Sequence, residues 1–484
     1  MDWFAAPDYW FARLVLERGL AAVYLLAFAN ALHQFPALLG ERGLLPVPRY
    51  LAQTRFRDAP SLFHFGYSDR LLRLVGWTGV VLAAATLLGL PAAAPLWTSV
   101  LVWLVLWAFY LSIVNVGQRF YSFGWESLLL EAGFLAVFLG NARMPPPLPI
   151  LLLFRWLALR VELGAGLIKL RGDRCWRDLT CLDYHHETQP MPNPLSWFAH
   201  RMPSWFHRLE VLGNYLAQLA APAALLLPQP IAGIGAVVMI ATQAYLMLSG
   251  NYAFLNLVTL VVASSALPDG FVGGLAPVSQ HPFAAPTWFV GAAATLTALV
   301  VLLSYWPVRN LFGRHQLMNF SFNRLHLVNT YGAFGSITRR RKEVVLEGAG
   351  AERPREEDWR EYEFFGKPGD PRRRPPQIAP YHLRLDWLMW FVALAPAYGD
   401  GWLLPLLRRL LEGDRATLRL LRYNPFPAAP PRWVRARLYR YRFSTRDERR
   451  ATGAWWIREP AGILVGPLAL RPADAAADVG SGVK

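Results

Sequence analysis

The sequence predicts a polytopic α-helical membrane domain of about 8–9 transmembrane helices, followed by an α+β, strand-rich C-terminal domain. Three observations lead to this fold class. The 484 residues are 54% hydrophobic and their mean hydropathy is positive. Long apolar runs dominate the chain before residue 306, and about twenty apolar residues cross a bilayer as a helix. After Trp306, short segments alternate apolar and charged residues, as half-buried strands do.

Up to nine apolar stretches make up the predicted membrane domain, residues 1–306. Proline-rich turns at 91–95 and 228–230 separate some of them, since proline ends helices. Trp and Tyr gather near their ends, as in an interfacial belt. Stretch 125–141 is short and stretches 231–268 run close together, so the count is eight or nine. The predicted spans are 11–32, 72–90, 95–115, 125–141, 149–170, 211–228, 231–249, 251–268 and 285–306.

Residues 307–465 predict a basic α+β domain, and residues 466–484 a disordered tail. Two apolar segments within the domain predict helices, DWLMWFVALA (386–395) and WLLPLLRRLLEGDRATLRLL (402–421). Six segments with strand-like patterns predict the sheet. They are GAFGSI (332–337), KEVVLEG (342–348), EYEFFG (361–366), HLRLD (382–386), WVRARLYRYRFS (433–444) and AWWIRE (454–459).

The formal net charge of +16 raises the question whether the protein binds nucleic acid. The basic runs at 339–342 and 372–374 are not interleaved with aromatic residues as a stacking platform requires. Attraction to anionic lipid headgroups is the better interpretation. The sequence contains no GxSxG elbow of a classical lipase and no phosphate-binding GxxxxGK[ST] loop. We therefore predict the lipid bilayer as a partner, and we predict no nucleic acid and no cofactor.

The predicted span 149–170 carries four charged residues. Arg155, Glu162 and Lys169 are spaced seven residues apart, which places them on one stripe of a helix, with Arg160 nearby. Charges inside a membrane are costly and by default indicate a functional site that faces protein or a water-filled cavity. A lysine at the end of a span can also extend its amine to the headgroups, which is the commoner case.

Two glutamates, Glu126 and Glu131, lie in the preceding predicted span. Opposite charges on adjacent antiparallel helices predict pairing with Arg155 and Arg160. Because buried pairs often fix helix packing, we favour a structural salt bridge over catalysis.

The loop after this helix holds both cysteines of the chain, Cys175 and Cys181. They are too few for a disulfide scaffold or for a four-ligand zinc site. Their spacing permits a disulfide, which would favour an oxidising compartment, but two reduced cysteines fit equally well. The cluster at 185–187 permits metal binding or acid–base chemistry, with a third ligand from Asp183, His200 or His207. Its spacing matches no metal motif, so we favour a proline-stiffened, hydrogen-bonded loop and predict no metal.

Four segments of the chain carry a family resemblance. They are residues 117–136, 167–198 (GLIKLRGDRCWRDLTCLDYHHETQPMPNPLSWF), 323–348 and 379–394. They resemble the lipase maturation factor family over nearly the whole chain. In the loop the motif residues are Asp173, Trp176, Asp183, Tyr184, Glu187 and Gln189. In the C-terminal part they are Asn329, Tyr331, Gly332, Arg384, Asp386 and Trp387.

The resemblance implies a multipass membrane protein. Its animal relatives reside in the endoplasmic reticulum, where they assist the folding of secreted lipases with the C-terminal domain in the lumen. The Ala-, Arg- and Pro-rich composition indicates a bacterium, in which the corresponding place is the cytoplasmic membrane. The positive-inside rule gives the opposite orientation, since basic residues gather in loops 33–71 and 171–207 and in the C-terminal domain. We follow the family topology, with the C-terminal domain on the non-cytoplasmic side.

A second, shorter resemblance concerns AGLIKL (165–170), which is similar to a segment of vitamin K-dependent γ-carboxylases. In that family the lysine of the segment acts as a base, and Lys169 occupies its position. This implies an alternative function, a membrane enzyme acting on a lipid, quinone or peptide, with Lys169, Glu162 and His185 as catalytic groups.

The two hypotheses predict different structures. A maturation factor with client proteins such as lipases needs an exposed apolar or aromatic patch on its C-terminal domain, for which Trp455, Trp456 and Tyr423 are candidates. An enzyme needs a cavity near Lys169. The groups expected to line that cavity are Glu126, Glu131, Arg160, Glu162 and His185.

Overall fold

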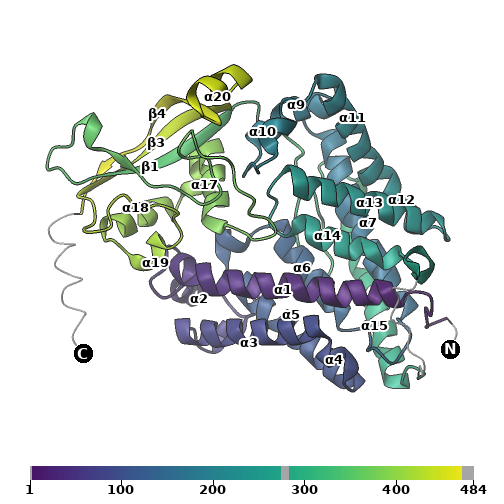
Figure 1. Ribbon diagram of the computed structural model, residues 1–484. Coiled ribbons are helices and arrows are strands. Elements are labelled where there is room, and N and C mark those ends of the chain that lie inside the picture. The colour runs from purple at the N-terminus through teal and green to yellow at the C-terminus, as the bar shows by residue number, and fades with distance from the viewer. Residues whose placement is uncertain (1–2, 274–282, 471–484) are drawn as a thin grey trace.

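The computed structural model describes residues 3–273 and 283–470 (Figure 1). Long helices occupy its N-terminal part, and the sheet lies at one end of them, at the left of the view. The first helices are α1 (Trp10–Leu39), α2 (Val47–Gln53), α3 (Asp69–Leu88), α4 (Leu90–Ala93), α5 (Leu96–Val116), α6 (Gly124–Ala136) and α7 (Leu148–Arg171). Those that follow are α8 (Arg174–Arg177), α9 (Leu182–Thr188), α10 (Ser196–Ala199), α11 (Ser204–Tyr215), α12 (Ala221–Ala224), α13 (Ile231–Ser249), α14 (Leu255–Ala263), α15 (Thr287–Leu303) and α16 (Tyr305–Phe312).

Within residues 3–273 and 283–470, four helical segments are long and apolar enough to cross a membrane, judged by length and composition. They are α3, α5, α13 and the continuous stretch Thr287–Phe312. The predicted span 125–141 forms only the 13-residue helix α6, and 211–228 is divided between α11, a π-helical turn and α12. A helical membrane domain is therefore confirmed, while the total of eight or nine crossings stays a prediction.

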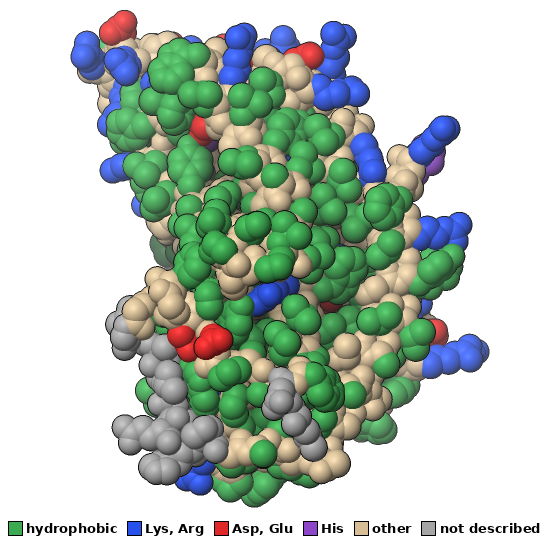
Figure 2. Space-filling view, turned by 90° about the vertical axis from the view of Figure 1, so that its right-hand side faces the viewer, with side chains coloured by type: hydrophobic (Ala, Val, Ile, Leu, Met, Phe, Trp, Pro, Cys, Tyr) green, Lys and Arg blue, Asp and Glu red, His purple; other side chains and the backbone are tan. Residues whose placement is uncertain are grey.

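The surface of the helical domain supports its membrane setting. Figure 2 shows a face covered largely by hydrophobic side chains, with most charged side chains toward its rim. Large apolar residues are exposed along α13 and α15, among them Ile234, Val237, Leu248, Val301 and Leu302. Water does not favour such a continuous apolar surface, whereas the hydrocarbon of a bilayer does.

Helix α1 is the central helix and packs against α3, α5, α6 and α14. Glycines allow its neighbours to approach closely. A Cβ atom at Gly79 of α3 would lie 2.6 Å from the Phe28 ring, and one at Gly76 would lie 2.7 Å from Leu32. Small residues of this kind let helix backbones pack tightly where no hydrophobic force acts between helices.

The C-terminal domain contains a four-stranded antiparallel sheet in the order β2-β1-β3-β4. Its strands are β1 (Arg341–Ala349), β2 (Arg360–Glu361), β3 (Trp433–Phe443) and β4 (Trp456–Leu468), and its helices are α17 (Arg384–Leu394), α18 (Leu403–Leu411), α19 (Arg415–Leu418) and α20 (Arg446–Thr452). Helix α17 packs on β1. The strands predicted at 342–348, 433–444 and 454–459 and both predicted helical segments are thus confirmed.

Three other strand predictions were wrong in whole or in part. GAFGSI (332–337) contains no strand, because it packs against α7: Gly335 accepts a backbone hydrogen bond from Asp173 and lies against Ile168. HLRLD (382–386) leads into the first turn of α17 instead of pairing in the sheet. EYEFFG (361–366) contributes only the end of β2 and one bridge between Glu363 and Tyr423.

Two of the three residues expected on an exposed aromatic patch are buried. Trp455 and Trp456 pack with Phe443 and with Trp197 of the loop in a separate hydrophobic cluster. Of the three candidates, only Tyr423 is exposed. The expectation failed because the loop from the helical domain covers this end of the sheet. Strand β4 extends to Leu468, into the predicted tail, whose remainder at 471–484 lies outside the described residues.

The close contact of α1 with α3 generates a test. Gly79→Ala should lower the thermal unfolding midpoint in detergent, because the new methyl group must displace the Phe28 ring, at a cost of about 1–3 kcal/mol. Gly291→Ala in α15 is the matched control, since its Cβ would meet open space. There the lower backbone entropy of alanine should stabilise by about 0.5–1 kcal/mol. Equal shifts in both variants would contradict this packing.

Candidate functional site

A buried ion pair joins the helical domain to the C-terminal domain. Glu126, in the first turn of α6, and Arg384, in the first turn of α17, have no exposed side-chain surface, and Nη1 of Arg384 donates to Oε1 of Glu126 at 2.7 Å. The guanidinium also lies 3.4 Å from the ring centroid of Tyr121. The two residues are 258 positions apart in the chain. Arg384 is therefore the point at which the second domain enters the helical one.

The remaining polar contacts of this pair come from four further segments. Nε of Arg384 donates to Asn30 of α1 at 3.0 Å, and Nη1 donates to the backbone oxygen of Phe120 at 2.8 Å. The hydroxyl of Tyr110, from α5, donates to Glu126. His382 lies 3.5 Å from the same carboxylate, and burial lowers the pKa of its ring to about 4, so that it is neutral at pH 7. These contacts satisfy much of the hydrogen-bonding capacity of two desolvated charges, as a stable buried pair requires.

A second buried pair lies further along the same helix. Glu131 of α6 pairs with Arg160 of α7, which confirms one of the predicted interhelical contacts. Oε2 of Glu131 also accepts from the backbone and side-chain nitrogens of Asn329, at 3.1 and 2.9 Å, and from Tyr331 at 2.8 Å. Arg160 donates to the backbone oxygen of Asn329 at 2.7 Å. This network holds the segment that leads from the last membrane helix into the sheet.

The other predicted pairing did not form as expected. Arg155 does not meet Glu126; its Nε donates to the backbone oxygen of Ser265 at 3.4 Å, and its guanidinium lies over the Tyr9 ring. Glu126 instead forms an ion pair with Arg384, whose position at the start of α17 could not be inferred from the predicted helical spans. Opposite charges on adjacent helices thus identified one pair of the two.

The charged stripe of α7, which consists of Arg155, Glu162 and Lys169, ends in a third polar cluster. Nζ of Lys169 donates to Oδ1 of Asn214 at 2.9 Å and to Oε1 of Gln218 at 2.7 Å, and lies 4.9 Å from the Trp176 ring centroid. Glu162 accepts a hydrogen bond from Gln243 of α13. Two amide oxygens and an aromatic face are groups that stabilise an ammonium ion.

The groups predicted to surround one cavity therefore belong to separate networks. Glu126 belongs to the first, Glu131 and Arg160 to the second, and Glu162 and Lys169 to the third. His185 has a different hydrogen-bond partner: its Nε2 is 2.7 Å from the hydroxyl of Tyr252, and burial lowers the pKa of its ring to about 3. No single hydrogen-bond network joins all the groups expected to line the cavity. Glu162 and His185 both interact electrostatically with Lys169, so a catalytic role for these three residues stays a prediction.

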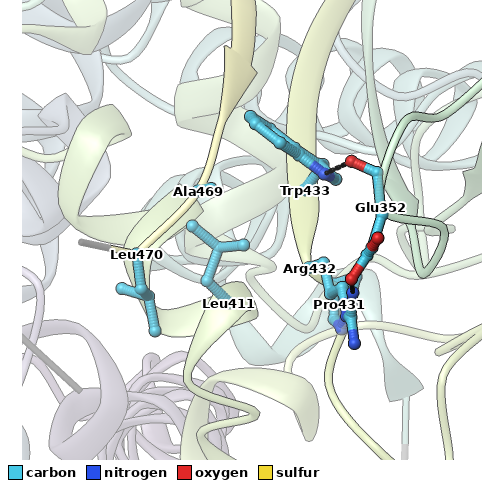
Figure 3. Close-up of a pocket in the computed structure, with 7 residues that line it drawn as sticks. All are labelled: Glu352, Leu411, Pro431, Arg432, Trp433, Ala469 and Leu470. Atoms are coloured by element: carbon cyan, nitrogen blue, oxygen red, sulfur yellow. Dashed lines mark hydrogen bonds and ion pairs between the residues drawn. The ribbon is translucent and has the colours of Figure 1, made fainter. Parts of the chain in front are cut away.

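Clefts in the described part of the chain include one at the base of the sheet (Figure 3). It has a volume of about 380 Å³ and lies between the start of β3, the end of α18 and the residues after β4. Glu352 closes one side by pairing with Arg432 at 3.0 Å and by accepting from the Trp433 indole at 3.1 Å. A second cleft is lined by Glu363, Arg373 and Tyr423. Neither cleft is lined by Lys169.

The loop 171–207 begins with a compact cap over the end of α7. Asp173 accepts from the backbone of Cys175 at 3.0 Å and so caps α8. Cys175 and Cys181 are joined as a disulfide with their Cα atoms 4.8 Å apart. The indole of Trp176 donates to the backbone oxygen of Phe334 at 2.8 Å. Gly332, on the same approaching segment, packs against Met318 and Ile168. The motif residues of the loop and of the C-terminal part thus meet here.

The second half of the loop is attached to the sheet. Oε2 of Glu187 accepts from the backbone nitrogen of Phe443 at 2.8 Å, and Arg341 of β1 donates to the backbone oxygens of Glu187 and Pro190 at 2.9 and 3.0 Å. Gln189 accepts from Tyr252 at 2.7 Å and donates to Ser196 at 2.8 Å. These bonds place the loop between the helices and the sheet.

Three motif residues play smaller parts. The Tyr184 ring lies under the guanidinium of Arg339, 5.7 Å from its centroid. Asp183 is half-buried near the start of α9, where its backbone nitrogen donates to Thr180. Trp387 is buried and meets the Trp125 ring edge-on at 5.0 Å. Each of them contributes to packing in this structure.

Asp386 anchors the loop that follows β2. Its Oδ1 accepts from the backbone nitrogens of Gly366 and Lys367 at 2.7 and 3.3 Å, and burial raises its pKa to about 6. Sequence reasoning missed the neighbouring triad, in which Glu343 pairs with Arg341 at 2.5 Å and with Lys367, all three buried. Arg341 and Glu343 are two apart on a strand and so share one face, a pattern that could have indicated a buried charged pair.

Comparison with known proteins identifies related chains. The family model described as the lipase maturation factor transmembrane domain matches residues 11–274, and that of the lipase maturation factor C-terminal domain matches residues 327–465. Lipase maturation factor 1 of Homo sapiens is 44% identical over 501 residues, which cover 96% of this chain and 88% of the human protein. Its counterpart in Mus musculus is 42% identical over 96% of this chain and 88% of its own. Lipase maturation factor 2 of Homo sapiens is 30% identical, over 92% and 81% of the two chains. No solved structure matches this chain.

The junction between the domains can be tested through its central pair. Glu126→Gln removes one charge and leaves the Arg384 guanidinium buried without a counter-ion, which should cost about 3–5 kcal/mol of unfolding free energy. Glu352→Gln is the matched control, because its partner Arg432 and Glu352 itself are exposed, and an exposed pair contributes about 0–1 kcal/mol. Thermal unfolding in detergent measures both variants. Similar losses in the two would show that the buried pair does not hold the domains together.

Proposed function

Because this chain belongs to the lipase maturation factor family, we propose that it is a membrane-embedded factor that assists the maturation of secreted lipases or related secreted proteins. The observation that carries the proposal is the match to both family domains within one chain, together with 44% identity to lipase maturation factor 1 of Homo sapiens over 96% of the sequence. The name of that relative states its client class, and the shared domain order supports the same class here.

The structure suggests how such a factor would work. The sheet is attached to the helical domain through Arg384 and to the loop 171–207 through Arg341, so it forms one rigid body with the membrane helices. A client that leaves the membrane beside this body would meet a surface held at a fixed distance from the bilayer. A preorganised surface loses less entropy on binding than a mobile one, which strengthens its contacts with unfinished proteins.

The free edge of β4 is the most suitable surface for a client. β4 is the last strand in the sheet order, and residues 459–463 are exposed, including Ile463 at 61%. An edge strand offers unpaired backbone groups that can add an extended segment of another chain, with affinity from the backbone and selectivity from alternate side chains. Unfinished lipase chains contain such segments, and this mode does not require one fixed sequence.

We further propose that the C-terminal domain and loop 171–207 face the non-cytoplasmic side, which in a bacterium is the periplasm. The C-terminal domain lies beside loop 33–71, because Arg409 of α18 donates to the backbone oxygen of Arg42, and loop 171–207 is attached to the same domain through Glu187. The Cys175–Cys181 disulfide favours an oxidising compartment, and folding of secreted clients takes place there. This arrangement requires an odd number of crossings between the N-terminus and the C-terminal domain, so of the two predicted totals it favours nine over eight.

Reporter fusions test the orientation. Alkaline phosphatase, which is active only in the periplasm, should be active when fused after the last residue. The control fusion after Ala94 lies between α3 and α5, one crossing away from loop 33–71, and should be inactive there but fluorescent with a green fluorescent protein reporter. The reverse pattern would support the positive-inside rule and overturn the proposed orientation.

Co-expression with a secreted lipase tests the function. In cells that lack this chain, the full-length protein should raise the enzymatic activity recovered per mass of secreted lipase. Ile463→Asp should lower that gain severalfold without changing the unfolding temperature, because a charge on the edge strand opposes pairing with a client. Leu404→Asp, an exposed apolar residue on α18, is the control and should keep the gain. If the wild type produces no gain with any secreted lipase, the proposed function is wrong.

A further inference from the structure

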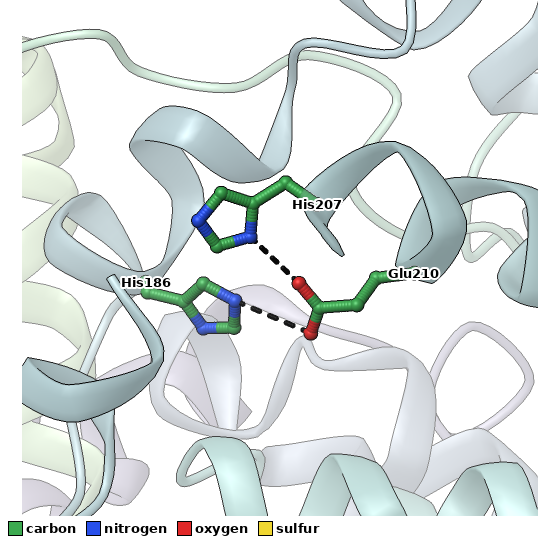
Figure 4. Close-up of side chains that lie close together, drawn as sticks. All are labelled: His186, His207 and Glu210. Atoms are coloured by element: carbon green, nitrogen blue, oxygen red, sulfur yellow. Dashed lines mark hydrogen bonds and ion pairs between the residues drawn. The ribbon is translucent and has the colours of Figure 1, made fainter. Parts of the chain in front are cut away.

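Three side chains from two helices of the loop region meet at one point (Figure 4). His207 and Glu210 come from α11, and His186 comes from α9, which packs against α11. One ligand atom of each lies within 4.8 Å of the others. Residues three apart share one face of a helix, which is why His207 and Glu210 point the same way.

The distances within this trio are close to those of a metal site. Nδ1 of His207 lies 2.7 Å from Oε2 of Glu210, and Nε2 of His186 lies 3.6 Å from Oε1. Zinc binds nitrogen and oxygen at about 2.0–2.2 Å in a tetrahedron, which separates neighbouring ligand atoms by about 3.3 Å. Small rotations of the side chains would therefore bring one nitrogen from each histidine and one carboxylate oxygen around a common centre.

The histidines also have hydrogen-bonding capacity that the protein does not use. His186 and His207 are only 3% and 2% exposed. Neither ring nitrogen of His186 has a hydrogen-bond partner among the described residues, and the same holds for Nε2 of His207. A buried polar atom without a partner costs free energy, and an ion is one of the few explanations for such atoms in a well-packed region. An imidazole nitrogen aimed at a carboxylate but too distant for a hydrogen bond fits this explanation.

A neighbouring residue holds the carboxylate in position. The hydroxyl of Tyr245, from α13, donates to Oε1 of Glu210. Metal-ligating carboxylates are commonly oriented by such a second hydrogen bond, which fixes their geometry before the ion arrives. Three elements, α9, α11 and α13, thus contribute to the same point.

We propose that His186, His207 and Glu210 form a binding site for a divalent transition-metal ion, with zinc as the best fit. Two imidazoles and one carboxylate form a common zinc ligand set, which leaves a fourth position for water, whereas calcium and magnesium prefer oxygen ligands alone. On binding, the ion takes the place of the proton between His207 and Glu210, and that proton leaves to solvent. The ion would tie α9 to α11 and so fix the loop that carries the disulfide.

From the sequence we expected a different arrangement in this region. We grouped His185, His186 and Glu187 and favoured a loop without metal. In the structure these three neighbours have different partners. Nε2 of His185 is hydrogen-bonded to the hydroxyl of Tyr252, and Glu187 accepts from the backbone nitrogen of Phe443. Of the three, His186 alone belongs to the trio. Of the third ligands considered, His207 is present, and Glu210 was not anticipated. The proposal does not depend on the client-directed function described above.

Zinc binding by the full-length protein in detergent tests the proposal. The protein is purified through an affinity tag without histidine, treated with a chelator, dialysed and loaded with zinc chloride. Bound metal is then counted by mass spectrometry, and the unfolding temperature is recorded with and without zinc. We expect one equivalent of zinc per chain and a higher unfolding temperature, because an ion that binds only the folded state stabilises it.

Variants locate the bound ion. His186→Phe keeps an aromatic ring in the buried position and should abolish stoichiometric binding. Tyr245→Phe, which removes only the supporting hydrogen bond, should weaken zinc binding about 10- to 100-fold. His200→Phe is the matched control, because His200 lies in the same loop, 3.5 Å from Glu187, outside the trio, and should bind zinc like the wild type. No zinc on the wild type, or undiminished zinc on a folded His186→Phe protein, would overturn the proposal.

Cobalt provides a second measurement of the same site. Its visible absorption reports tetrahedral nitrogen and oxygen ligands, and it should give a band in the wild type that is lost in His186→Phe.

Discussion

The buried contact between Glu126 and Arg384 is the constraint on which the rest of the structure depends. A guanidinium without exposed surface must keep a counter-ion and several acceptors, and here they come from α1, α6 and the segment before α6. Removing either charge would leave the other desolvated. The helical domain and the sheet therefore cannot separate without large cost, and the orientation of α17 fixes that of β1, which it contacts.

Loop 171–207 forms a second attachment between the helical domain and the sheet. It starts at α7, caps that helix through Trp176 and ends on the sheet through Trp197, whose indole donates to the backbone oxygen of Ser444 at 3.0 Å. Neither half of the molecule alone offers all its partners. Much of the sequence that resembles the lipase maturation factor family lies in this loop and in the segments that meet it. Many residues of the family signature therefore lie at the junction of the two domains.

A rigid body at the membrane surface suits a factor that acts on other proteins. The charged groups inside the helices are matched by partners: Glu131 by Arg160 and Asn329, and Lys169 by two amide oxygens and an indole. They are committed to holding the helices and the entering C-terminal segment. The apolar sides of the helices suit lipid, and the edge of β4 is the surface that we propose for an extended client chain.

The sequence by itself determined the class of the protein, the apolar spans at α3, α5, α13 and α15, the strands β1 and β3, and the expectation of charge pairing between α6 and α7. All of these follow from hydropathy, alternation or charge on neighbouring helices, which are local properties of the chain. Only the tertiary structure decided that Glu126 meets Arg384, that Trp455 and Trp456 are buried, and that His186 joins His207 and Glu210. Among 49 lysines and arginines, no local pattern selects the one that a buried carboxylate will meet. That choice depends on how distant segments pack, because a charge is stable in the interior only where the whole fold supplies its partners.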